Sequence, residues 1–134
     1  MPSENEIALA KYRLDRAKEL IDDAKSLFDC GSYKSGNNRA YYAIFSSMRA
    51  ILALDGVDFK KHSGVIQYFL RTYVKTGIFT KEYSAIILNA SEIRNASDYD
   101  DFYIASREET EQQIDSAQKF YDAVSAYILD KIGK

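Results

Sequence analysis

Apolar residues recur every three or four positions along most of the chain, and no segment keeps the two-residue alternation of a half-buried strand. This spacing predicts helices over the following residues: 4–29, 33–54, 63–75, 80–100 and 106–131. Ser3 with Glu6, and Ser106 with Glu109, have the spacing of a capping box at the start of the first and last helices. The chain therefore reads as helical from end to end.

Glycine marks the ends of three predicted helices, at Gly31, Gly56 and Gly77, where a left-handed residue often ends a helix. Long helices joined by short connections are typical of antiparallel neighbours. We therefore predict an all-α fold, an antiparallel up-down bundle of four long helices and one short helix, in a single domain over residues 1–134. Its core should include one apolar stripe per helix, with these residues prominent: Ile44, Phe45, Met48, Ile86, Phe120 and Val124.

The composition narrows the functional classes. The chain carries 18 basic and 20 acidic residues, a net charge of −2, so it has no general attraction to nucleic-acid backbones, although a local basic patch stays open. No apolar run approaches the roughly 20 residues of a membrane span, and no signal peptide follows Met1. The single Cys30 cannot form an internal disulfide. We expect a cytoplasmic protein with no membrane contact.

Cofactor motifs are missing from the sequence. His62 is the only histidine, so a His-rich metal site cannot form, and neither a glycine-rich phosphate loop nor a dinucleotide fingerprint occurs. We therefore expect no metal and no cofactor.

One polar cluster interrupts the helical pattern near the end of the fourth predicted helix. Arg94 and Asp98 are four residues apart and share a helix face, and Asn95 and Tyr99 repeat that offset on the neighbouring face. Asn, Ser and Asp are poor helix-interior residues because they hydrogen-bond to the backbone. The cluster is either a polar site or a helix end held by a surface salt bridge.

Two further stretches carry basic residues. Lys61 and His62 lead into the short third helix, where free N–H groups and the helix dipole favour an anion. The alternative is an ordinary solvated loop with Ser63 as the helix cap. Arg39 and Tyr42 lie on a different face from the apolar stripe of the second helix, and a half-buried Arg39 would need a carboxylate partner.

Taken in order, these residues resemble the HEPN (higher eukaryote and prokaryote nucleotide-binding) superfamily over about residues 14–127. The resemblance rests on five stretches: Gly31-Ser32-Tyr33, the run from Asn38 to Phe45, Lys61 to Ile66 with Phe69, Arg94 to Tyr99, and Ala117 to Phe120. It is nearest to the short, stand-alone prokaryotic members. It implies a helical bundle that forms a homodimer, paired with a minimal nucleotidyltransferase in a toxin–antitoxin module.

The same resemblance implies a ribonuclease motif from which this chain departs. Many HEPN members cleave RNA without a metal, using an Arg followed after four to six residues by a His. Counted from Arg94, the His position falls on Tyr99, Asp100 or Asp101. A phenol is a poor base at neutral pH, since its ordinary pKa is about 10. Only His62, from another helix or another subunit, could supply an imidazole.

Three hypotheses therefore stay open, and whether the protein is an enzyme is undecided. In the first, the protein binds nucleotide or RNA phosphate through five residues and works with a nucleotidyltransferase: Arg94, Asn95, Asp98, Lys61 and Arg39. In the second it is a ribonuclease toxin in which Arg94 faces the phosphate and His62 or Tyr99 transfers protons. In the third the polar cluster only fixes the geometry of an adaptor bundle.

Overall fold

The structure of the protein, a computed structural model, describes residues 1–133. Its elements in chain order are α1 (Glu4–Asp29), α2 (Tyr33–Asp55), α3 (His62–Phe69), the π-helix η1 (Leu70–Val74), α4 (Lys81–Tyr99) and α5 (Arg107–Lys131). No strand occurs in this part of the chain. The predicted all-α fold is confirmed. Among the same residues, no helix combines the length and the apolar content that crossing a bilayer requires.

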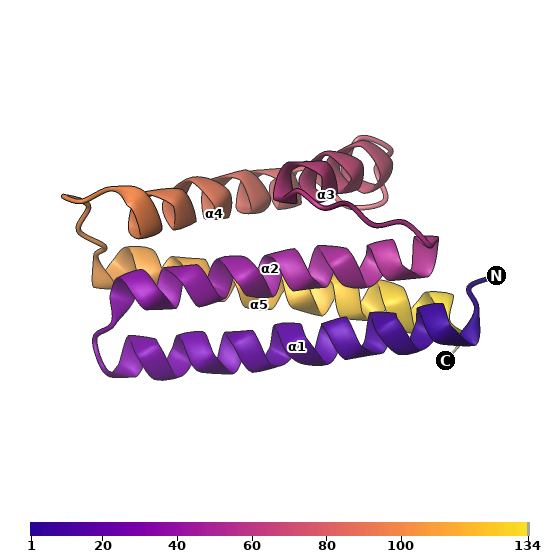
Figure 1. The fold of residues 1–134 in the computed structure, drawn as a ribbon, viewed down its shortest axis with the longest axis horizontal. Helices are drawn as coiled ribbons and strands as arrows, with labels where there is room; N and C mark the ends of the chain where they lie inside the picture. Colours follow the sequence, from indigo (N-terminus) through magenta and orange to yellow (C-terminus); the bar gives the residue numbers. More distant parts are fainter. Residues whose placement is uncertain (134) are drawn as a thin grey trace.

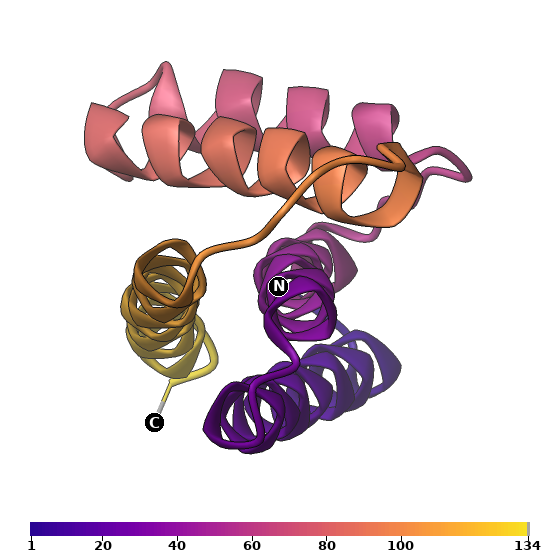
Figure 2. The ribbon, with the colours of Figure 1, turned by 90° about the vertical axis from the view of Figure 1, so that its left-hand side faces the viewer.

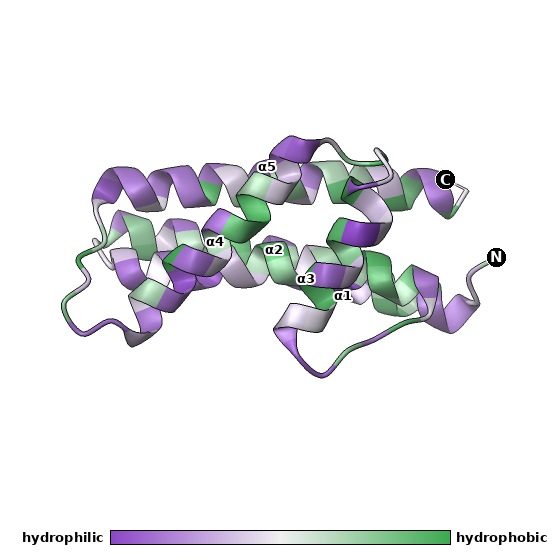
Figure 3. Ribbon diagram, turned by 90° about the horizontal axis from the view of Figure 1, so that it is seen from above, coloured by the Kyte–Doolittle hydropathy of each residue, from purple (hydrophilic) through white to green (hydrophobic). Residues whose placement is uncertain are grey.

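The four long helices alternate in direction, and α2 lies at the centre of the assembly (Figure 1). α1 packs along α2, and α5 lies against both of them. α3 and α4 form a second layer that crosses the first obliquely over α2, as the two turned views show (Figures 2 and 3). Both chain ends lie at the same end of the bundle (Figure 1).

The interior forms because the predicted apolar stripes meet around α2. Ile44, Met48, Phe120 and Val124 are completely buried, and Phe45 is 8% exposed. Ile86 departs from the prediction: it is only half-buried, and Ile87 takes the interior position on α4 instead. A helix face can contact the core over a narrow strip, and the sequence pattern does not show which edge of the stripe faces inward.

Two glycines illustrate how the backbone meets the packing. Gly56 ends α2 with a φ of 72°, a left-handed conformation that costs other residues energy. Gly36 lies inside α2 where α5 approaches closely, since a Cβ there would stand 2.9 Å from Thr110 Cγ2. A larger residue at position 36 would push α2 and α5 apart.

The helix ends match the predictions in part. Ser3 and Glu6 form the complete capping box, with both reciprocal hydrogen bonds. Ser106 accepts a hydrogen bond from the Glu109 N–H, but the Glu109 carboxylate turns inward to Tyr103 and Asn37 and leaves the box half formed.

The third helix was predicted as one continuous α-helix and changes its character along its length. It begins at His62, with Lys61 rather than Ser63 as its N-cap, and from Leu70 its hydrogen bonds widen to the π pattern. A π segment inserts one extra residue per turn, which rotates the following side chains relative to an α-helix.

Candidate functional site

The polar cluster of α4 folds back onto α2 rather than into solvent. Arg94 donates from Nη2 to the Tyr42 hydroxyl at 2.8 Å and from Nη1 to Asn95 Oδ1 at 3.3 Å. Its Nε lies 3.0 Å from Asp98 Oδ2, although the N–H does not point at an acceptor, so this contact is an ion pair without a hydrogen bond. The guanidinium is therefore held by α4 and α2 together, and its side chain is only 17% exposed.

Aromatic rings surround the same guanidinium. Arg94 Cζ lies 5.2 Å from the ring centre of Tyr41, 5.3 Å from that of Tyr42 and 5.7 Å from that of Tyr99. A cation over an aromatic face is stabilised by the ring quadrupole, more so when water is excluded. Tyr41 and Tyr42 are adjacent in the chain, and their rings meet edge to face at 5.2 Å.

The predicted partner of Arg94, Asp98, also connects to α2. Its carboxylate accepts from Asn38 Nδ2 at 3.0 and 3.3 Å, and Asn38 Oδ1 in turn accepts from Arg39 Nη1 at 2.6 Å. Arg39 itself is exposed and takes a neutral amide as its partner, not the carboxylate that a buried arginine would need. A chain of polar contacts thus runs from Arg94 to Arg39.

His62 reaches the same pair of tyrosines from the start of α3. Its Nδ1 lies 3.0 Å from the Tyr41 hydroxyl, and its ring centre lies 4.1 Å from that of Phe45. The distances to the ring centres of Tyr41 and Tyr42 are 5.9 and 5.7 Å. His62 and Arg94 are far apart in sequence, and the fold brings them onto the same two rings.

The surroundings of His62 change two pKa values. Burial, followed by the positive charges of Arg94 and Arg49, lowers the pKa of His62 below its ordinary 6.5, so its neutral form is favoured at pH 7. Burial raises the pKa of Tyr41 to about 12, with Arg94 acting in the opposite direction. The Tyr41 phenol therefore keeps its proton, and the pair can share a hydrogen bond between two neutral groups.

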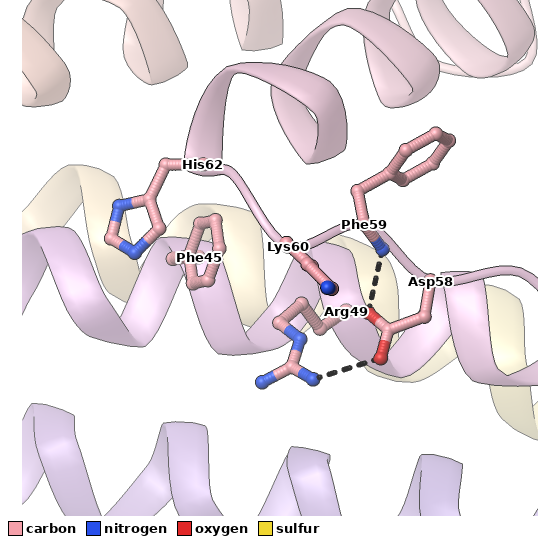
Figure 4. Close-up of a pocket in the computed structure, with 6 residues that line it drawn as sticks. All are labelled: Phe45, Arg49, Asp58, Phe59, Lys60 and His62. Atoms are coloured by element: carbon pink, nitrogen blue, oxygen red, sulfur yellow. Dashed lines mark hydrogen bonds and ion pairs between the residues drawn. The ribbon is translucent and has the colours of Figure 1, made fainter.

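A cleft of about 540 Å³ opens beside His62, lined by Phe45, Arg49, Asp58, Phe59, Lys60 and His62 (Figure 4). Arg49 Nη2 lies 3.5 Å from Asp58 Oδ2, and Asp58 also accepts the Phe59 N–H. Phe59 packs on Gly64, where an added Cβ would lie 2.9 Å from the Phe59 Cβ. The loop before α3 is thus anchored so that the imidazole faces the cleft.

The other predicted residues divide into two groups. Asn95, Asp98, Tyr99 and Arg39 lie along the polar chain around Arg94, as described above. Lys61 is exposed at the N-cap of α3 and forms no side-chain hydrogen bond or ion pair within the described residues. The structure therefore unites His62 with the Arg94 cluster and leaves Lys61 outside it.

A buried polar contact lies behind the cluster. Asn37 is 1% exposed and donates from Nδ2 to Ser97 Oγ at 3.1 Å, with Glu109 Oε1 at 3.5 Å. Tyr103 donates to the same Glu109, and burial, together with this hydrogen bond, raises the pKa of Tyr103 to about 12. α2, α4 and α5 are therefore linked by polar side chains at this end of the bundle.

Sequence reasoning missed Arg49 and the direct roles of Tyr41 and Asn38. A signal for Arg49 was present, because Arg39, Tyr42, Ser46 and Arg49 follow a three-four-three spacing that places them on one face of α2. No such spacing links Tyr41 to His62, which meet only through the fold. Among residues 1–133, no three His, Cys, Asp or Glu side chains come together in a way that could hold a metal ion.

The protein is thus an all-helical bundle in which a histidine, an arginine and two tyrosines gather between the two layers of helices. A model of the HEPN domain matches residues 10–127. The chain therefore belongs to the HEPN domain family, and the resemblance inferred from its motifs is confirmed.

Relatives of known name support the same assignment. The chain is 37% identical over 122 residues to the "UPF0332 protein" of Thermotoga maritima, an alignment that covers 91% of this chain and 92% of the relative. Two proteins of Methanocaldococcus jannaschii carry the name "Putative toxin"; one is 35% identical, with 83% of this chain and 82% of the relative covered. The other is 26% identical, with 88% and 80% covered. The family thus includes relatives with a toxin name.

Proposed function

We propose that this HEPN protein binds phosphate groups of RNA or of nucleotides where α2, α3 and α4 meet, as the toxin-type component of a two-component module. The observation that carries the proposal is the convergence of Arg94 and His62 on Tyr41 and Tyr42. A guanidinium is permanently charged and can bind a phosphate with two parallel hydrogen bonds. The tyrosine rings offer faces on which a base can stack.

Arg94 is the central phosphate-binding residue in this proposal, and its present contacts show which hydrogen bonds must change when a phosphate binds. The Nε–H has no aligned acceptor, and Asn95 accepts from Nη1 over a long 3.3 Å. The Nε atom is buried, so a phosphate oxygen would take over the Nη1 donor, while Asp98 competes with the phosphate for the guanidinium and Tyr42 keeps the side chain in place. Asn95, once released, would present its amide to the ligand.

The partner in this proposal is a minimal nucleotidyltransferase, and the protein itself forms a homodimer. The toxin names of the relatives support a two-component module. Three apolar side chains close to the end of α4 support a protein contact there, since Tyr99, Phe102 and Ile104 are 70, 97 and 87% exposed. Light scattering at micromolar concentration tests the dimer, and a monomer of 15 kDa would contradict it.

Arg94 variants test phosphate binding. Labelled RNA and labelled nucleotides are titrated against the wild type, Arg94→Ala, Arg94→Lys and Lys61→Ala. We expect Arg94→Ala to weaken binding more than Lys61→Ala, and Arg94→Lys to restore little because an ammonium lacks the guanidinium fork. If the wild type binds neither ligand and Arg94→Ala only lowers the melting temperature, the cluster is structural and the adaptor hypothesis is correct.

The position of His62 favours one second candidate, a metal-independent ribonuclease. The tautomer that donates from Nδ1 to the Tyr41 oxygen leaves a lone pair on Nε2, and the lowered pKa of His62 keeps the ring neutral near pH 7. In this scheme Nε2 takes the proton of a ribose 2′-hydroxyl as its oxygen attacks the adjacent phosphorus. The bond to the 5′ oxygen breaks, Tyr99 returns a proton to that oxygen, and Arg94 faces the phosphate.

His62→Ala separates the two candidates. Under the binding function it leaves RNA affinity nearly intact. Under the ribonuclease function, His62→Ala abolishes RNA cleavage, which in the wild type yields a 2′,3′-cyclic phosphate and a 5′-hydroxyl. If the wild type produces no such ends from RNA that it binds, the ribonuclease candidate is wrong.

A further inference from the structure

We propose that the groove between α1 and α2 binds consecutive phosphates of a single-stranded oligonucleotide, as an extension of the site at His62. The inference rests on the proposed function, because it adds a second set of phosphate-binding residues for the same bound nucleic acid. It goes further in two ways. It assigns Arg16 and Arg49 a binding role beside Arg39, and it selects an oligonucleotide over a single nucleotide.

The groove is a cleft of about 420 Å³ on the side of His62 that faces α1. Arg16 enters it from α1, and Arg39, Tyr42, Ser46 and Arg49 enter it from one face of α2. No carboxylate lines this cleft. Three guanidinium groups around one opening without an acid favour an anion there.

The nearby carboxylates leave these cations only partly neutralised. Arg39 forms no ion pair within residues 1–133 and donates to the neutral Asn38. Arg16 lies 3.4 Å from Glu19, one turn further along α1, in a contact whose side chains are 52 and 67% exposed. Such surface pairs contribute little free energy, so a phosphate can replace the acid at small cost.

The third cation, Arg49, shares its acid. Asp58 lies 3.5 Å from Arg49 and 3.9 Å from Arg13, so one carboxylate faces two guanidinium groups. Burial and then the charge of Arg49 lower the pKa of Arg13, and Asp58 acts in the opposite direction, as expected where two guanidinium groups lie near one carboxylate. The overall charge of the protein is −2, and this concentration of positive charge is therefore a local feature of one surface.

The groove continues past His62 into the cleft of Figure 4. Phe45, Arg49 and His62 line both openings, and the second one ends at Phe59 and Lys60. Cations are thus spread along a track from Arg39 to Lys60, with the rings of Tyr42, Phe45 and Phe59 between them. Asp58 also lines the second cleft, where it pairs with Arg49. Alternating cations and aromatic faces are the arrangement by which proteins hold successive phosphates and bases of a single strand. A single nucleotide would occupy only part of this track.

The test measures binding of a fluorescent 12-nucleotide 2′-O-methyl RNA, which cannot be cleaved through its 2′ oxygen. The double variant Arg16→Ala/Arg39→Ala is compared with the wild type by anisotropy between 50 and 200 mM salt. The control Lys25→Ala/Arg71→Ala removes the same charge from exposed positions outside both clefts. Labelled ATP serves as the single-nucleotide probe, and thermal melting confirms that each variant is folded.

We expect the double variant to bind the 12-mer at least tenfold more weakly than the control does. The slope of its log affinity against log salt concentration should be less steep by about 1.4, because each of the two lost phosphate contacts removes ~0.7 from the slope for a single strand. Equal affinity of the double variant and the control would overturn the groove and leave the proposed function standing. No binding of any probe by the wild type would overturn both. Equal weakening for ATP and for the 12-mer would contradict the oligonucleotide assignment.

Discussion

α2 and the C-terminal half of α4 lie against each other and are held in different ways. α2 is buried along nearly its whole length, with apolar side chains on several of its faces. α4 buries only Ile87, Ala90 and Ser97, and from Arg94 onward it contacts α2 through polar side chains. One region is thus fixed by packing and the other by hydrogen bonds and an ion pair.

The difference has consequences for function. Apolar contacts are not directional and tolerate many arrangements of similar volume, whereas hydrogen bonds require particular distances and angles. The polar junction can therefore position Arg94 and Tyr42 accurately while contributing modestly to stability. The interior can change its shape only at a large cost in free energy. The predictions below test this division, beginning with the largest effect.

Removing a core ring should have the largest effect on stability. Phe120 is completely buried and packs against Phe69, Phe79 and Tyr83. We expect Phe120→Ala to lower the free energy of unfolding by about 3–5 kcal/mol, because it deletes buried surface and leaves a cavity. Urea denaturation measures the loss, and Leu88→Ala on α4 is the control, because Leu88 is 46% exposed. Equal losses for both would show that the interior is not what holds the bundle.

Removing Arg94 should have an intermediate effect. Arg94→Ala deletes the hydrogen bond to Tyr42 and leaves Asp98 with only its Asn38 contact. We expect a loss of about 1.5–3 kcal/mol, the usual range for hydrogen bonds that involve a charged group. The same urea experiment measures it. A loss as large as that of Phe120→Ala would mean that the junction, too, is part of the structural core.

Removing Ser97 should have a smaller effect on stability. Ser97→Ala leaves the buried Asn37 amide with only the long contact to Glu109. We expect a loss of about 1 kcal/mol. Ser91→Ala on the same helix, which removes no side-chain hydrogen bond seen in the structure, should leave stability unchanged or raise it slightly, because alanine has the higher helix propensity. If the two variants behave alike, the Asn37 contact does not help to hold α4.

The smallest effect should come from the titration of His62. Because its pKa in the folded protein is lowered below 6.5, the unfolded chain binds more protons than the folded protein between these two pKa values. The contribution of His62 is therefore fully present above about pH 6.5 and is lost as the pH falls toward its folded pKa. Unfolding midpoints at pH 7.5 and 5.5 measure the change.

His62→Gln provides the comparison for this pH dependence, because it removes the titrating group and keeps a polar side chain. We expect its stability to fall less than that of the wild type over the same interval. A wild type that loses no more stability than the variant would show that His62 is not the group responsible.

Much of the fold follows from local sequence. The apolar periodicity identified the five α-helices but not the π-helix η1, and the glycines at positions 31, 56 and 77 have the positive φ expected at helix ends. These features depend on residues a few positions apart, so they can be read without knowing the fold. The half-formed box at Ser106 shows the limit, because the Glu109 side chain found partners from α2 and from the loop before α5.

The candidate site also combines features that local sequence predicts with contacts that only the fold creates. The four-residue spacing of Arg94 and Asp98 predicted their ion pair, and the motifs predicted the HEPN family, because both lie within short segments. Only the tertiary structure decided that Arg94 turns toward Tyr42, that His62 reaches Tyr41, and that Arg16 of α1 and Arg39 of α2 line one cleft. These contacts depend on how helices cross, and many side-chain pairs far apart in sequence could fill the same volume. The sequence alone therefore determined which side chains are candidates for the chemistry, and the packing of α3 and α4 on α2 determined which of them lie together.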